Sequence, residues 1–353
     1  MDAVGRTVKI AAIQPALRLG EMDWNLRRCE DLVRQAAREH SPDVIVLPEA
    51  MSSPNVYDPS MRAVPGPIDG PPYQLLRKLA RELNCVVGGG YLTVRGDDAR
   101  HTYVLAEPEG ATYLHDKDEP SAWEYCYYTG GQDDGVFKTS LGTVGCSMGW
   151  ESARGRTARR MVAGRVQLIL GGCCWPAYPR WAFPKAWLRR DMEYYRVWAL
   201  DTTRNLARAV GAPAALAWHV GDVKGGTPLM PKVPWSTIMT GETQIVERDG
   251  RVLERLAYED GEGYIAAEVA VADPEPLDPI PTGFWLRPQT FTIHAVWHYM
   301  KQHGKVRYAL DKQAGRFPWQ GLAGGEIFLD SETPAPAAET ADAQAPTPAM
   351  DPR

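Results

Sequence analysis

Three apolar runs of strand length, separated by two segments of helical periodicity, constrain the fold of this chain more than any other feature. The runs are Val8–Gln14, Asp43–Glu49 and Cys85–Leu92, and each is too continuously apolar for a strand with one face in water. Between them, Asn25–His40 and Tyr73–Asn84 carry apolar residues at intervals of three and four. The order β-α-β-α-β predicts a parallel sheet that is buried on both faces.

The rest of the chain repeats this alternation and adds short antiparallel segments. Further strands are predicted at His101–Ala106, Ala111–His115, Ser140–Met148, Val166–Gly171, Ala212–Trp218, Ser236–Met239, Thr243–Arg248, Val252–Leu256 and Tyr264–Val269, and further helices at Thr157–Ala163 and Lys185–Thr202. Because the alternation gives way to consecutive strands in each half, we predict two packed sheets with helices outside. This is an α/β fold, a four-layer αββα sandwich.

Changes in composition along the chain predict its domain organisation. Residues 1–271 hold the alternating pattern and form the predicted αββα domain. Residues 272–330 are Pro-rich and then aromatic, which suits a C-terminal extension that wraps a partner subunit. Residues 331–353 are mostly Pro, Ala and acidic residues with almost nothing to bury, and they are predicted to be disordered.

Charge and hydropathy argue against two classes of partner. Of the 353 residues, 39 are Lys or Arg and 44 are Asp or Glu, and the basic residues are spread along the chain, so we expect no nucleic-acid partner. The start of the sequence lacks an apolar segment of signal-peptide length, and nowhere do roughly 18 apolar residues follow one another. We therefore expect no membrane partner and a cytoplasmic location.

Signatures of metal and cofactor binding are missing from the sequence. The six cysteines stand at irregular spacings without paired C-x-x-C units, which argues against disulfides and structural zinc. His294 and His298 have helical spacing, but no carboxylate follows them in the HExxH manner. No Gly-rich fingerprint follows the first predicted strand. We predict no cofactor and no metal ion.

Three residues that bear on catalysis stand at the ends of predicted strands. Glu49 ends the run VIVLPE, Lys117 follows a hairpin strand in YLHDKDEP, and Gly149 stands at the turn in GTVGCSMGWE. A carboxylate that is partly desolvated at the end of a buried strand has a raised pKa and suits proton transfer. An ammonium beside it suits stabilisation of the negative charge that develops when an amide or nitrile is attacked.

These motifs, in this order, resemble those of the carbon-nitrogen hydrolase, or nitrilase, family over roughly residues 8–269. The resemblance implies an αββα fold, Glu49 as a base, Lys117 as a cation and a cysteine nucleophile where this chain has Gly149. The run EYCYYTGG resembles the family segment that brings a second, supporting glutamate to the pocket, here Glu124. The family also implies a small-molecule substrate or ligand and a homo-oligomer of paired αββα units.

The glycine at position 149 is the departure from the family pattern. Loss of a nucleophile typically lowers the rate by about 10⁶. We predict that Gly149 leaves open space in which water or a substrate group is deprotonated by Glu49 while Lys117 holds the developing charge. One alternative is a catalytically inactive pseudoenzyme that binds a small ligand or a partner protein. The other is a hydrolase whose nucleophile is displaced to Cys174, after the next predicted strand.

Four residues beside the strand ends are predicted to contact the substrate. Trp150 and Glu151 follow Gly149 directly, and Cys174 and Trp175 follow the strand that is predicted next. Tryptophans are concentrated in this part of the chain, which favours an aromatic-walled site for a planar or cationic ligand. The alternative for these tryptophans is packing in the core or between subunits.

Overall fold

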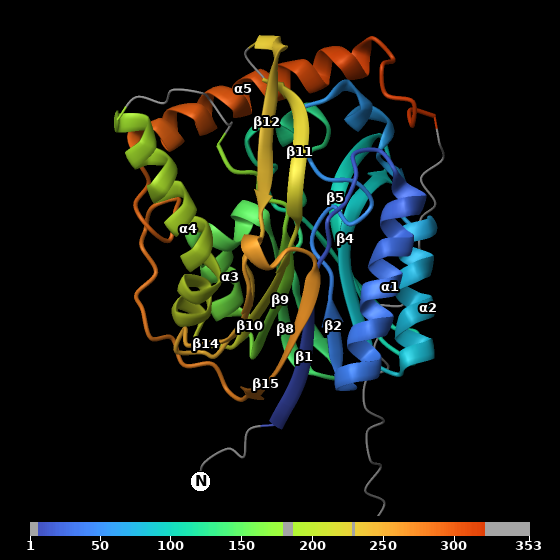
Figure 1. Ribbon diagram of the computed structural model, residues 1–353, viewed down its shortest axis with the longest axis vertical. Helices are drawn as coiled ribbons and strands as arrows, with labels where there is room; N and C mark the ends of the chain where they lie inside the picture. Colours follow the sequence, from blue (N-terminus) through green and yellow to red (C-terminus); the bar gives the residue numbers. More distant parts are fainter. Residues whose placement is uncertain (1–5, 179–185, 228–229, 322–353) are drawn as a thin grey trace, which may run out of the picture.

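The computed structural model describes residues 6–178, 186–227 and 230–321. Within them, two β-sheets pack face to face, and helices cover the outer face of each sheet (Figure 1). The four-layer αββα sandwich predicted from the sequence is therefore confirmed. No helix of the described residues is both long and apolar enough to cross a membrane.

The first sheet has the strand order β15-β1-β2-β4-β5-β6, with the short β3 beside β4. Its strands are β1 (Arg6–Gln14), β2 (Val44–Val46), β3 (Gly66–Pro67), β4 (Val86–Arg95), β5 (Asp98–Ala106), β6 (Thr112–Asp116) and β15 (Gly263–Val271). At its centre, β2 runs parallel to both β1 and β4. The amphipathic helices α1 (Met22–His40) and α2 (Pro71–Leu83) pack on its outer face.

The second sheet has the order β14-β13-β10-β9-β8-β7, with β9 parallel to both β8 and β10. Its strands are β7 (Val136–Thr139), β8 (Gly142–Met148), β9 (Leu168–Cys173), β10 (Ala214–Trp218), β13 (Thr243–Val246) and β14 (Val252–Leu256). Helices α3 (Gly155–Ala163) and α4 (Ala186–Val210) cover its outer face. Both sheets are thus buried on two faces, as the apolar strands require.

Side chains along β1 alternate between two parts of the core. Val8, Ile10 and Ala12 join the core between the sheets, whereas Ala11 and Ile13 join the core beneath α1 and α2. Successive side chains of a strand point to opposite faces, so an uninterrupted apolar run fills both cores at once.

Two further elements complete the end of the sandwich at which the site lies. The hairpin of β11 (Val220–Thr227) and β12 (Met230–Thr240) extends from the body, and α5 (Phe291–Gln313) crosses this end (Figure 1). Helix α5 packs closely on the short helix η2 (Ala122–Cys126), and Gly304 of α5 lies so near Tyr125 that a Cβ atom there would clash with it. Part of the extension predicted for residues 272–330 is therefore packed against its own chain.

Several predicted boundaries are corrected by the structure. Strand β2 ends at Val46, not at Glu49, because Pro48 has no N–H for a strand ladder and Ala50 has the positive φ of a turn. Helix α4 continues to Val210, and β12 is longer than predicted. Strands β7 and β11 and helix α5 were not predicted. The tail 331–353 lies outside the described residues.

Candidate active site

Glu49, Lys117 and Gly149 converge at one edge of the two sheets. Gly149 follows β8 directly, Lys117 follows β6 directly, and Glu49 lies three residues beyond β2. Their proximity is shown by the backbone at 149, since a Cβ atom built there would lie 3.1 Å from Lys117 Nζ and would clash with Glu49 Oε1. The structure therefore brings together the three residues that the sequence analysis singled out.

The charged groups form a buried carboxylate-ammonium-carboxylate cluster. Lys117 Nζ donates to Glu49 Oε2 at 3.0 Å and to Glu124 Oε2 at 2.9 Å. Glu49, Lys117 and Glu124 are 0%, 1% and 5% exposed. Charges this far from water are stable only when they are paired and hydrogen-bonded, so each member of the cluster depends on the others.

Burial and pairing move the pKa values of the cluster in different directions. Burial raises the pKa of Glu49 to about 7, although Lys117 opposes the shift. Burial alone would lower the pKa of Lys117, but the attraction of Glu124 and Glu49 raises it above its ordinary value. For Glu124 the opposing effects of burial and of Lys117 leave the pKa below its ordinary value. Glu49 is thus the member whose charge changes near neutral pH.

The space expected beside Gly149 is filled, which corrects the prediction of an open notch. The Glu49 carboxylate occupies it: Oε1 accepts a hydrogen bond from the Cys174 backbone N–H at 2.8 Å, while Oε2 accepts from Lys117. Gly149 has a φ of +53°, so the turn itself favours glycine, and the carboxylate lies where a Cβ atom would stand. The Glu49 carboxylate thus occupies the space in which a side chain at position 149 would lie.

Buried residues that the sequence analysis missed hold this cluster in place. Glu124 also accepts from Tyr128 Oη, from the Ser121 N–H and from Asn55 Nδ2. The Nε2 atom of His101 accepts from the Ala50 N–H at 3.0 Å. Tyr128 lies in the run EYCYYTGG, whereas Asn55, His101 and Ser121 belong to none of the motifs that the sequence analysis used.

Two neutral histidines flank the Glu49 segment. His219 Nε2 donates to the Glu49 backbone oxygen at 2.5 Å. Burial lowers the pKa of His101 to about 3 and that of His219 to about 4, so neither carries a charge at neutral pH. The cationic group of the site is therefore Lys117.

The Glu151 carboxylate, which was predicted to contact the substrate, is engaged in a separate buried network. Its oxygens accept from the Met148 N–H, and they lie 3.0 Å from His115 Nε2 and 3.1 Å from Arg160 Nη2. Burial would raise its pKa, but Arg160 and His115 hold it well below its ordinary value. Glu151 is 0% exposed, and its place in this network suits it to anchoring the turn after β8.

Cys174 contacts the charged cluster through its backbone N–H, whereas its thiol contacts residues outside the cluster. Its Sγ accepts from the Asn55 N–H at 3.2 Å and contacts Met239. Burial, followed by the nearby Glu49 carboxylate, raises the pKa of this thiol well above its ordinary value. Cys173 is buried and shifted in the same direction. A protonated, buried thiol is a poor nucleophile, which argues against the displaced-nucleophile alternative.

Trp150 and Trp175 belong to a cluster of aromatic side chains beside the site. Trp150 stacks on Trp297 of α5 with 5.4 Å between ring centroids, and Trp175 stacks on Trp218 at 5.2 Å. Trp175 is 1% exposed, so packing accounts for its burial. Aromatic residues are thus clustered beside the site, and α5 supplies some of them.

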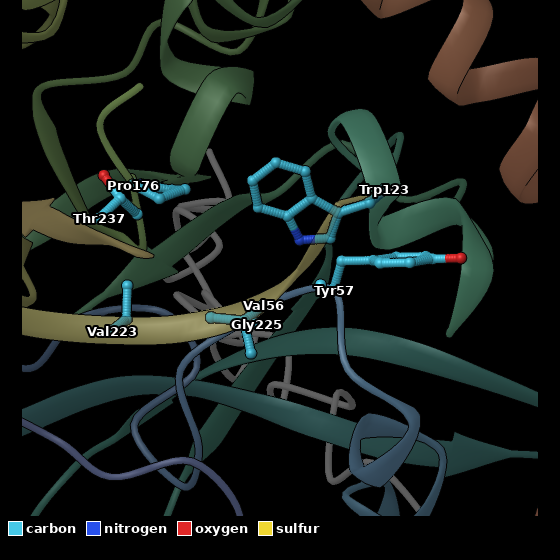
Figure 2. A pocket seen from close by; sticks show the side chains of 8 residues that line it. Val56, Tyr57, Trp123, Pro176, Val223, Gly225 and Thr237 are labelled. Carbon is cyan, nitrogen blue, oxygen red and sulfur yellow. The ribbon is translucent and has the colours of Figure 1, made fainter. Parts of the chain in front are cut away.

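A narrow apolar pocket is lined by Val56 and Trp123, the chain neighbours of Asn55 and Glu124. Figure 2 shows Trp123 and Tyr57 on one side and Pro176 and Thr237 on the other. Its volume is about 10 Å³, which is room for about one water molecule. Val56 and Val223 of this pocket pack in one cluster with Ala50, which follows Glu49 in the chain, and with Cys174, whose N–H donates to the Glu49 carboxylate. Glu49, Lys117 and Gly149 do not themselves line the pocket.

Solved structures of the nitrilase superfamily have a similar fold. A CN-hydrolase superfamily protein of Xanthomonas campestris with an arsenic adduct in its active site is 15% identical, with 75% of this chain and 91% of that chain covered and a TM-score of 0.57. Nit3 of Saccharomyces cerevisiae is 17% identical, with 76% and 92% covered and a TM-score of 0.55. A mutant of the amidase of Nesterenkonia sp. AN1, with acrylamide added at its active-site cysteine, is 16% identical, with 82% and 99% covered and a TM-score of 0.56.

At these identities the solved structures show the fold alone. No curated protein sequence matches the chain. The model of the carbon-nitrogen hydrolase family matches residues 9–277, which include Glu49, Lys117, Glu124 and Gly149. This protein therefore belongs to the carbon-nitrogen hydrolase family.

Proposed function

We propose that this protein acts on a small carbon-nitrogen compound of the amide, nitrile or carbamoyl type without a covalent thiol intermediate. The observation that carries the proposal is the Glu49 carboxylate, which has a pKa near 7 and lies between Lys117 and the backbone at 149. A base is most effective when its pKa is close to the working pH. A fixed ammonium beside it lowers the energy of a developing oxyanion.

In the proposed reaction of an amide, Glu49 takes a proton from water as the water oxygen attacks the carbonyl carbon. The carbonyl oxygen becomes negative and receives a hydrogen bond from Lys117. Glu49 then returns the proton to the nitrogen, the carbon-nitrogen bond breaks, and the products are a carboxylic acid and an amine or ammonia. The Glu49 side chain must turn away from Gly149 to admit the substrate, since its carboxylate fills that space.

Removal of both nearby thiols tests the noncovalent route. We expect the double variant Cys173→Ala/Cys174→Ala to release ammonia from a panel of small amides and nitriles within about threefold of the wild-type rate, because neither buried thiol enters the reaction. Thermal unfolding checks that the variant is folded. A folded double variant without turnover would show that a cysteine is the nucleophile and would overturn the proposal.

A second candidate function is a pseudoenzyme that binds a ligand or a partner protein. It is favoured by the filled space at Gly149 and by the complete burial of Glu49. This candidate requires that the wild type turns over no compound of the panel and that Glu49→Gln still binds the same ligands. Turnover that disappears in Glu49→Gln would exclude it.

We extend the proposal to location and assembly: a cytoplasmic homo-oligomer that acts as an amidase. Exposed apolar residues on α5 support the assembly, among them Phe291 at 85%, Val306 at 60% and Leu310 at 55% exposed. Apolar surface of this kind is typical of contacts between subunits.

A further inference from the structure

A second cavity beside the apolar pocket carries charged groups that the proposed reaction does not use. Its volume is about 330 Å³, and Arg62 and Arg307 line it from η1 (Pro59–Ala63) and α5. Tyr57, Gly225 and Gly226 line both this cavity and the apolar pocket, so the two spaces meet at these residues; Tyr57 and Gly225 are labelled in Figure 2.

One buried carboxylate fixes the arginines. Asp311 is 1% exposed, and its Oδ2 accepts from Arg62 Nε at 2.8 Å and from Arg307 Nε at 3.0 Å. Its Oδ1 accepts from Arg316 Nη1 at 2.8 Å. Burial would raise the pKa of Asp311, but the hydrogen bonds from Arg316, Arg307 and Arg62 hold it below its ordinary value. Asp311 is therefore ionised, and it orients two guanidinium groups at the cavity wall.

Two arginines and two aspartates line the cavity, and the arginines keep hydrogen-bond donors in excess. Three guanidinium groups meet the single carboxylate of Asp311. The other acidic residue of the cavity is Asp58, whose Oδ1 is engaged with Ser60 N and Oγ at the start of η1. Arg307 binds Asp311 through Nε, so its Nη1 and Nη2 atoms have no protein partner among the described residues. Such a fork matches the two oxygens of a carboxylate.

We propose that this cavity binds the carboxylate of an anionic substrate whose carbon-nitrogen group extends toward the adjoining apolar pocket, which must widen to admit it because it now has room for about one water molecule. The statement that the carbon-nitrogen end reacts depends on the proposed function. The statement that the carboxylate end binds here is inferred from Arg62 and Arg307 alone. Because Arg307 comes from α5, the C-terminal extension supplies half of this specificity. The substrate class is thus an amide or nitrile of a short carboxylic acid.

Matched pairs of probes test the charge preference without any need for turnover. The monoamides of the dicarboxylic acids from malonic to adipic acid each have a diamide that differs only by an uncharged amide in place of the carboxylate. We expect calorimetry to show that, at the best chain length, the monoamide binds about 10- to 100-fold more tightly than its diamide, the usual range for charge-assisted hydrogen bonds. Equal binding at every length would overturn the proposal.

Variants of the arginines test whether the cavity wall causes the preference for the monoamide over the diamide. Arg62→Gln and Arg307→Gln should each bring the monoamide and diamide within about threefold of each other, because each removes a guanidinium from the cavity wall. Arg316→Gln is the matched control, because Arg316 also pairs with Asp311 but does not line the cavity, and it should keep the preference. An equal loss in all three variants would show that Asp311 pairing, and not the cavity, sets the preference, and would contradict the proposal.

Failure of this inference is separable from failure of the proposed function. A wild type that prefers monoamides in binding but turns none of them over supports the carboxylate site and refutes the catalytic proposal. A wild type that turns over neutral amides but does not prefer monoamides in binding supports the catalytic proposal and refutes the carboxylate site. Arg307→Lys, which keeps a positive charge, should retain part of the preference if Arg307→Gln proves unstable.

Discussion

Replacing Lys117 with alanine should lower the free energy of unfolding by about 3 to 5 kcal/mol, the usual loss when one partner of a buried ion pair is removed. Lys117 is 1% exposed and is the shared donor to Glu49 and Glu124. Without it, two buried carboxylates face each other without a cation, and the pKa of Glu49 should rise further. Chemical denaturation of the wild type and the variant measures the loss.

A lysine at the surface provides the control for this substitution. Lys78 donates to Glu30 at 3.0 Å, but half of its side chain is exposed, so Lys78→Ala should cost less than about 1 kcal/mol. If Lys117→Ala is no more destabilising than Lys78→Ala, the buried cluster does not contribute to stability as described.

Replacing Glu49 with glutamine should lower kcat by about 10²- to 10⁴-fold, the usual contribution of a general base. Glutamine keeps the shape and can still hydrogen-bond, but it accepts no proton. In the wild type kcat/KM should rise as the pH increases through about 7, because the carboxylate is the active form and burial has raised the pKa of Glu49 to about 7. The measurement is ammonia release from the best substrate of the panel between pH 5.5 and 8.5.

An exposed carboxylate serves as the control for Glu49→Gln. The side chain of Glu268 on β15 is 60% exposed and pairs with Lys9, so Glu268→Gln should keep the wild-type rate and pH profile. If Glu49→Gln keeps both as well, Glu49 is not the base.

The core of the fold was predictable because its strands are buried on both faces. A strand such as β4 gives an apolar run in any single sequence, and such runs locate both sheets. Helix α5 escaped prediction because its apolar residues do not form one stripe: Trp297 and Met300 are buried, whereas Val306 and Leu310 are exposed. Strand β11 escaped because its sequence VGDVKGGT holds three glycines and two charges.

That Glu49, Lys117 and Gly149 meet was predictable only from the resemblance of their motifs to the family, because they follow β2 and β6 of one sheet and β8 of the other, and none of these strands neighbours another. The direction of each side chain was not predictable. The position of the Glu49 carboxylate is set by the Cys174 N–H and by Lys117, which come from distant elements. Glu151 is adjacent to the site in sequence, but its side chain turns back to the Met148 N–H. The arginines at Asp311 depend on α5, which was itself missed.

The central claim is that the Glu49 carboxylate occupies the space in which a nucleophile's side chain would stand. Gly149→Ala tests it most directly when compared with Gly96→Ala, because both glycines have a similar φ, +53° and +57°, but a Cβ at 96 meets nothing within 4 Å. The left-handed backbone costs each variant about 1 to 2 kcal/mol. A methyl group at 149 must also push the carboxylate from the Cys174 N–H, which should add about 1 to 3 kcal/mol of lost stability. A Gly149→Ala variant that is clearly less stable than Gly96→Ala is the predicted result, and equal stability of the two would contradict the account.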